Sequence, residues 1–170
     1  GGRAIIGGQS GTTAGNTAFE MSAAGLNADG TLDPTFADAG KMVTSFGGSG
    51  SQRVLSAAVD ATGRILLGGV YSGSGPDDFG ALRLAPSGAF DTTFGDGGLV
   101  ATDFNGQSDE ITALLPQSDG KLLVAGFSVP VGGGSSIASA RYLASGQLDP
   151  TFGTGGRTTT APPANADLTA

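Results

Sequence analysis

A short motif that returns at a fixed spacing constrains the fold of this chain more than any other feature. The five residues 32–36 (LDPTF) recur as residues 90–94 (FDTTF) and as residues 148–152 (LDPTF), and both spacings are 58 residues. Glycines flank the three copies at constant offsets, before the motif at Gly30, Gly88 and Gly146 and after it at Gly40, Gly98 and Gly156. This self-similarity predicts a repeat architecture in which each unit packs against its neighbours.

Each complete unit predicts four short strands. In the middle of the chain they are residues 41–46, 54–60, 65–70 and 79–84, which are short, rich in apolar residues and bounded by turn-forming residues. The turns at residues 60–63 and 117–120 end in glycine, as hairpin turns commonly do. We therefore expect residues 54–60 to pair antiparallel with residues 65–70, and about eleven strands in all.

An all-β chain of this kind has few ways to bury apolar surface. Radial stacking of four-stranded antiparallel sheets, as in the blades of a β-propeller, is the best of them, and a β-solenoid is the main alternative. We predict one repeat domain over residues 1–170, with a partial blade at 1–40, full blades at 41–98 and 99–156, and the start of a next blade at 157–170.

Three blades are too few for a closed ring, because closed propellers have about four to eight. We expect unpaired sheet edges at both ends, which demand a partner. Residues 157–160 are expected to join residues 4–26 of a neighbouring chain, in a ring or a filament. The alternative is that the chain is a fragment of a longer propeller.

The motif residues also resemble a known family. Asp119-Gly120-Lys121, Ala125-Gly126, Arg141-Tyr142 and residues 148–156 are similar to the delta-60 repeats of secreted bacterial β-propeller proteins. The first copy departs from the pattern, with Gly25 where Arg83 and Arg141 stand and Ala37 where Gly95 and Gly153 stand. The resemblance implies an exported repeat protein without an assigned catalytic activity, and it carries no active site over to this chain.

Composition excludes several classes of function. The net charge is −7 without a basic cluster, which argues against nucleic-acid partners and anionic membranes, and no apolar run is long enough to insert into a bilayer. The absence of cysteine and histidine removes thiolate nucleophiles, the usual general base and the commonest zinc ligands. A Gly-, Ser- and Thr-rich chain favours a bacterial exported protein, extracellular or at the cell surface.

Oxygen-bearing side chains mark the one weak candidate for a metal site. Asn27, Asp29 and Asp33 are spaced like the start of a calcium loop. The other copies keep only the aspartates equivalent to Asp33, which are Asp91 and Asp149, so a plain turn is the alternative. We expect no other cofactor.

The motif itself is predicted to be a structural corner. Its aspartates Asp33, Asp91 and Asp149 occupy equivalent positions, which is typical of architectural rather than catalytic carboxylates. Its aromatic residues Phe36, Phe94 and Phe152 are expected to be buried, together with the glycines Gly40, Gly98 and Gly156 that follow. Arg83 and Arg141 precede their aspartates by eight residues and predict ion pairs, with a ligand-binding guanidinium as the alternative.

These patterns favour a non-catalytic exported structural or interaction module over an enzyme. Its expected partners are other copies of itself or further blades of the same protein. The alternative is a lectin-like propeller that binds a glycan or small ligand between its blades. Lectins usually stack sugars on Trp or Tyr, and this chain has no Trp and only Tyr71 and Tyr142.

Overall fold

The described part of the chain folds into antiparallel strands joined by turns, with no helix among its residues. The computed structural model describes residues 2–11, 19–44, 50–73, 75–104, 108–129, 132 and 134–161. Within these ranges there are eleven strands, which confirms the predicted all-β class: β1 (Ala4–Gly11), β2 (Phe19–Leu26), β3 (Lys41–Thr44), β4 (Arg53–Val59), β5 (Ile65–Ser72), β6 (Asp77–Leu84), β7 (Leu99–Thr102), β8 (Asp109–Pro116), β9 (Leu122–Ser128), β10 (Ser136–Tyr142) and β11 (Arg157–Thr160). None of these residues belongs to a helix with the length and apolar character needed to cross a bilayer.

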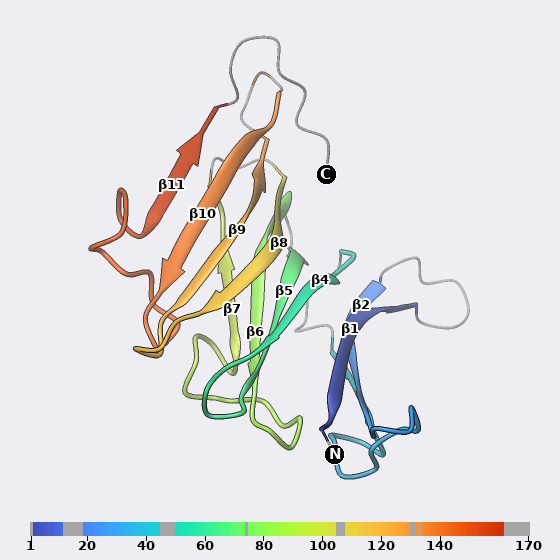
Figure 1. The fold of residues 1–170 in the computed structure, drawn as a ribbon. Coiled ribbons are helices and arrows are strands. Elements are labelled where there is room, and N and C mark those ends of the chain that lie inside the picture. Colours follow the sequence, from blue (N-terminus) through green and yellow to red (C-terminus); the bar gives the residue numbers. More distant parts are fainter. Residues whose placement is uncertain are drawn as a thin grey trace.

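The strands form three successive sheets of β-propeller type (Figure 1). The first has the order β1-β2-β3, the second β4-β5-β6-β7 and the third β8-β9-β10-β11. Strands β4 and β5 pair antiparallel as predicted, with Val59 opposite Ile65. The first sheet has no described strand at the position that β4 and β8 fill in the other two sheets.

The sheet boundaries differ from the blade boundaries expected at residues 41, 99 and 157. The strands that begin there, β3, β7 and β11, each complete the sheet that precedes them. Strand β11 therefore pairs with β10 of its own chain and does not begin a next blade, whereas the expected contact of residues 157–160 with residues 4–26 of a neighbouring chain stays a prediction. The cause is the motif, which reverses the chain so tightly that the next strand returns along the same sheet.

Backbone hydrogen bonds within each corner explain this reversal. In the second sheet the amide of Gly98 donates to the Phe94 carbonyl at 2.9 Å, and the Gly98 carbonyl accepts from the backbone amide of Arg83 at 2.8 Å. Gly98 has a φ of 107°, a conformation that favours glycine. In the first copy Ala37 adopts a φ of 45°, in the left-handed region of its counterpart Gly95 at 57°, so its corner is regular despite the substitution.

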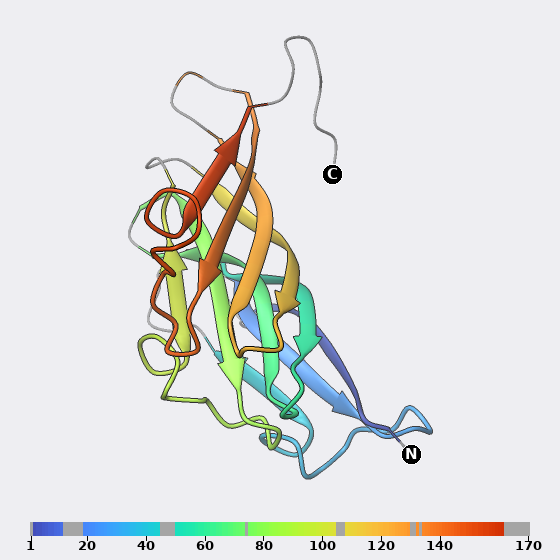
Figure 2. The ribbon, with the colours of Figure 1, turned by 60° about the vertical axis from the view of Figure 1, so that its left-hand side comes forward.

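The core lies between the sheets, which pack face to face (Figure 2). Met21 and Ala23 of the first sheet pack with Leu67 and Leu82 of the second. The opposite face of the second sheet packs on the third, through the residues Leu66, Phe79, Ala81, Phe94, Val100, Ile111, Leu122, Val124, Ala138, Ala140 and Tyr142. No sheet covers its own apolar faces, so each depends on the next.

A repeated glycine permits this close approach. A Cβ at Gly68 would lie 2.7 Å from Leu114 Cδ2 of β8, and a Cβ at Gly7 would lie 2.4 Å from Val54 Cγ1 of β4. These glycines occupy equivalent positions in their sheets, and each faces the first strand of the following sheet. Successive blades therefore meet at the same point.

The three motif phenylalanines differ in burial. Phe36 and Phe94 are 0% and 1% exposed. Phe94 also makes an edge contact with Tyr142 of the third sheet, with ring centroids 6.4 Å apart. Phe152 is only half-buried, contrary to the expectation that all three are buried. It lacks the cover of a following sheet within the described residues.

This difference predicts unequal costs of truncation. Phe94→Ala is expected to lower the free energy of unfolding by about 3–5 kcal/mol, because it empties a site between two sheets. Phe152→Ala is expected to cost about 1–2 kcal/mol, since part of the Phe152 side chain is already exposed to water. Urea denaturation followed by circular dichroism measures both, and equal losses would contradict the assignment of Phe94 to the inter-sheet core.

Candidate functional site

Each motif aspartate lies in a turn that a threonine two residues later closes. The Asp33 Oδ1 atom accepts hydrogen bonds from the Thr35 amide at 2.8 Å and from the Thr35 hydroxyl at 2.6 Å. The same two bonds recur for Asp91 with Thr93 and for Asp149 with Thr151. The bonds from the Thr35 hydroxyl and amide hold the pKa of Asp33 below its usual range.

A buried guanidinium completes the corner. Arg83 donates from Nε to Asp91 Oδ2 at 2.8 Å and from Nη2 to the Thr93 hydroxyl at 3.1 Å. Its Cζ atom lies 4.5 Å from the centroid of the Phe94 ring. Arg141 repeats this arrangement with Asp149, Thr151 and Phe152. The predicted ion pairs are thus present, at the turn between strands rather than in an open cleft.

The corner also reaches the next blade. Arg83 Nη1 donates to the Ala144 carbonyl at 2.8 Å, and the amide of Gly95 donates to the Ser145 carbonyl at 2.8 Å. Ala144 and Ser145 lie in the turn after β10 of the third sheet. We call this pair of donors, a guanidinium and a corner amide on two successive carbonyls, the inter-blade clamp.

The first copy builds the same clamp from a different residue. Arg3, which precedes β1, donates from Nε to Asp33 at 2.5 Å and from Nη1 to the Pro86 carbonyl at 2.6 Å. The Ala37 amide donates to the Ser87 carbonyl at 2.7 Å. The pair 86 and 87 precedes 144 and 145 by one repeat. Two different arginines therefore bind equivalent carbonyls.

Sequence reasoning missed the role of Arg3, because the repeat aligns it with Arg64. The missing arginine at Gly25 was the available signal, since the first Asp-x-Thr-Phe motif is otherwise intact and its carboxylate needs a cation. The structure explains the glycine, because a Cβ at position 25 would lie 2.7 Å from Phe36 Cβ.

The calcium candidates have hydrogen-bond partners nearby. The Asn27 Nδ2 group donates to the Thr31 hydroxyl at 3.1 Å, and Asp29 Oδ1 accepts from the Thr31 amide at 3.0 Å. Asp33 pairs with Arg3. These contacts fit the plain-turn alternative, and calcium here stays a prediction.

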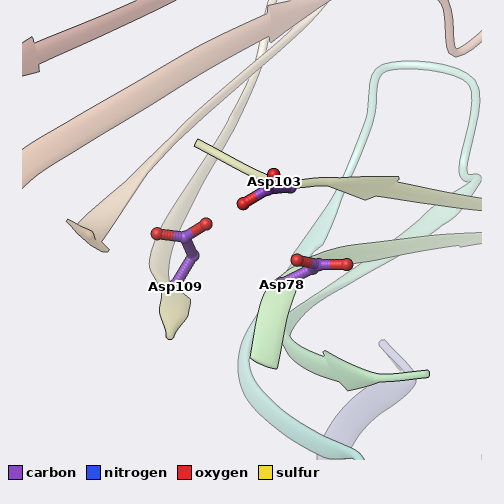
Figure 3. A group of neighbouring side chains, drawn as sticks. All are labelled: Asp78, Asp103 and Asp109. Carbon is purple, nitrogen blue, oxygen red and sulfur yellow. The ribbon is translucent and has the colours of Figure 1, made fainter. Parts of the chain in front are cut away.

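A second group of carboxylates lies at the opposite end of the sheets (Figure 3). Asp78 on β6, Asp103 after β7 and Asp109 at the start of β8 each offer an oxygen within 4.8 Å of the others. Asp109 Oδ2 accepts from the Phe104 amide at 2.8 Å, while Oδ1 is buried without a hydrogen-bond partner among the described residues. This cluster could not be predicted from the sequence, because its members lie outside the repeated motif and come from two sheets.

The surroundings of two members of this cluster, Asp78 and Asp109, oppose their ionisation. Burial raises the pKa of Asp109. Hydrogen bonds from Ser128 and Phe104 act in the opposite direction, and the nearby charge of Asp103 raises the pKa further. Burial also raises the pKa of Asp78, followed by the charges of Asp103 and Asp109. The ionised forms of Asp78 and Asp109 are therefore disfavoured, whereas those of the motif aspartates are stabilised.

Comparison with known proteins supports the repeat. Residues 61–94 and 117–152 match the family described as "Domain of unknown function (DUF5122) beta-propeller". Both matched segments end at the motif phenylalanine, Phe94 or Phe152, and together they cover less than half of the chain. No curated protein and no solved structure matches the chain. The chain thus carries a propeller-type repeat, in agreement with its sheets.

The two carboxylate environments predict opposite responses to charge removal. Asp109→Asn is expected to raise the free energy of unfolding at pH 7. A carboxyl whose folded pKa is raised binds more protons folded than unfolded, so stability falls as pH rises from about 3.9 through the folded pKa. Thermal unfolding from pH 3 to 8 measures this dependence. The stability of the Asp109→Asn variant should fall less with rising pH than that of the parent chain.

Asp149→Asn is the matched control. The bonds from the Thr151 hydroxyl and amide lower the pKa of Asp149, and Lys121 and Arg141 lower it further. The contribution of ionised Asp149 to the free energy of unfolding is therefore present above about pH 3.9 and is lost as pH falls through the folded pKa. This variant should be less stable than the parent at pH 7. A loss of stability at pH 7 from Asp109→Asn would contradict the assigned repulsion.

Proposed function

We propose that this chain is a non-catalytic structural module of an exported assembly, and that further blades of the same repeat pack on both outer faces of its stack. The observation that carries the proposal is the exposure of apolar positions whose repeat equivalents are buried. Closer membership of the delta-60 repeats belongs to the same proposal and rests on the motif residues.

The outer face of the first sheet is one such surface. Ile6 of β1 is 54% exposed. Its equivalent in the second sheet, Leu67, is 0% exposed because it packs on the first sheet. Ala24 and Leu26 of β2 are half-buried, although their equivalents Leu82 and Leu84 are fully buried. A preceding blade would cover this face as the first sheet covers the second.

The outer face of the third sheet is the complementary surface. Ile137 of β10 is 47% exposed. Its equivalent in the second sheet, Phe79, is 0% exposed because it packs on the third sheet. A face of this type packs on a face of the other type within the chain, so the two outer faces fit one another head to tail. This favours a second copy as the partner of the isolated chain.

One substitution supports a second copy in particular. Ala125 stands on the outer face of the third sheet where Gly7 and Gly68 stand in the other two. A Cβ at those glycines would strike Val54 of β4 or Ile111 and Leu114 of β8. The first sheet has no described strand equivalent to β4, so the methyl group of Ala125 meets no such obstacle when that sheet is the partner.

The alternative of a glycan-binding propeller has less support. Tyr142 is 1% exposed, and its hydroxyl donates to the Thr102 hydroxyl at 2.7 Å. Tyr71 is then the one tyrosine left to stack on a sugar, and the sequence has no Trp. The motif aspartates are engaged by threonine and arginine, which supports a structural rather than catalytic role for them. The exported location rests on composition and on the family resemblance.

Complementary blocked chains test the proposal. Ile6→Asp places a charge on the outer face of the first sheet, and Ile137→Asp places one on the outer face of the third. Both positions are exposed, so each variant should fold. Each variant alone should stay monomeric, because its one open face has no open counterpart, and an equimolar mixture should form a 1:1 dimer by analytical ultracentrifugation.

The unmodified chain is the reference, and its mean mass should rise with concentration. Circular dichroism of the two variants checks that the sheets are intact. A mixture that remains monomeric at concentrations where the unmodified chain associates would overturn the head-to-tail contact, and a monomeric unmodified chain would overturn the proposed function.

A further inference from the structure

We infer that the inter-blade clamp sets the direction and register of this contact, with Arg141 and Gly153 of one copy donating to the carbonyls of Ala28 and Asp29 of a second copy. The inference rests on the proposed function, because it names the polar contacts that would accompany the apolar faces. It concerns residues at the two outer faces that have no clamp partner within the described chain.

The donor half of the clamp is built at the third corner. Arg141 Nε binds Asp149 at 2.8 Å and Nη2 binds the Thr151 hydroxyl at 3.0 Å, which are the bonds that position Arg83 in the second corner. In the second corner the remaining nitrogen, Nη1, donates to the next blade. The Nη1 of Arg141 finds no acceptor among the described residues.

The corner amide is prepared in the same way. Gly153 has a φ of 54°, close to the 57° of Gly95, whose amide donates to the Ser145 carbonyl of the next blade. Gly153 is an exposed residue, and its amide has no acceptor among the described residues. Two donors with the geometry of an engaged clamp thus lie side by side on the outer face of the third sheet.

The acceptor half lies in the turn after β2. Ala28 and Asp29 precede Pro86 and Ser87 by one repeat of 58 residues, and the latter pair accepts the first clamp. The turn has the same internal bond, from Gly30 to the Asn27 carbonyl at 3.0 Å. The carbonyls of Ala28 and Asp29 accept no hydrogen bond from the described residues, and both residues are exposed.

The chemistry of the clamp makes it selective. A guanidinium held by a carboxylate and a hydroxyl loses little rotational freedom when its last nitrogen binds, and a charged donor strengthens the bond to a carbonyl. The donors and the acceptors lie on opposite outer faces, so the contact has one direction. The apolar faces supply contact area, whereas the clamp fixes which turn meets which corner.

The same substitution placed in either of two partners provides the test. In the mixture of blocked chains, the Ile6→Asp chain supplies the third sheet to the contact, and the Ile137→Asp chain supplies the first. Arg141→Lys in the Ile6→Asp chain should raise the dissociation constant about tenfold, because the single nitrogen of lysine cannot reach the three acceptors that the three guanidinium nitrogens bind. Arg141→Lys in the Ile137→Asp chain should leave it unchanged.

The second placement is the matched control, since it has the same effect on folding and net charge. Lys121 Nζ lies 3.1 Å from Asp149 Oδ2, so the carboxylate keeps a cation in both chains. Equal dissociation constants for the two placements would overturn the clamp and leave the proposed function standing. A failure of the parent blocked chains to associate would overturn both.

Discussion

The packing of one sheet on the next is the constraint on which the rest of this structure depends. No helix covers a sheet in the part of the chain that the structure describes, and the apolar residues of β5 and β6 point to both faces. The second sheet lies between two others, and its central strands β5 and β6 are accordingly almost uniformly buried. The chain therefore gains stability in proportion to the number of neighbouring sheets, as expected for repeat proteins.

The inter-blade clamp explains why the corner keeps its chemistry although its residues vary. A carboxylate, a hydroxyl and a guanidinium in this geometry satisfy one another and leave one nitrogen to bind the next blade. Arg3 reaches that place from before β1, and Arg83 reaches it from β6, yet each donates to the equivalent turn of the following blade. The same contact is therefore made by arginines from two different positions of the repeat.

The repeat and the strands could be predicted from the sequence because both are local patterns. A motif at a spacing of 58 and glycines at fixed offsets determine where strands begin and end. The sheet to which β3, β7 and β11 belong could not be read in this way, since it depends on how tightly the corner reverses. The cluster of Asp78, Asp103 and Asp109 depends on the distance between two sheets, which no spacing along the chain encodes.

Hydrogen exchange at two equivalent corner amides tests the central claim most directly. In the Ile137→Asp chain, which cannot extend the stack beyond its third sheet, the Gly95 amide should be protected by its bond to Ser145 and the Gly153 amide should exchange rapidly. In the unmodified chain at associating concentrations, the Gly153 amide should become protected as well. If Gly95 exchanges as fast as Gly153 in the blocked chain, the blades are not held together by the contacts described.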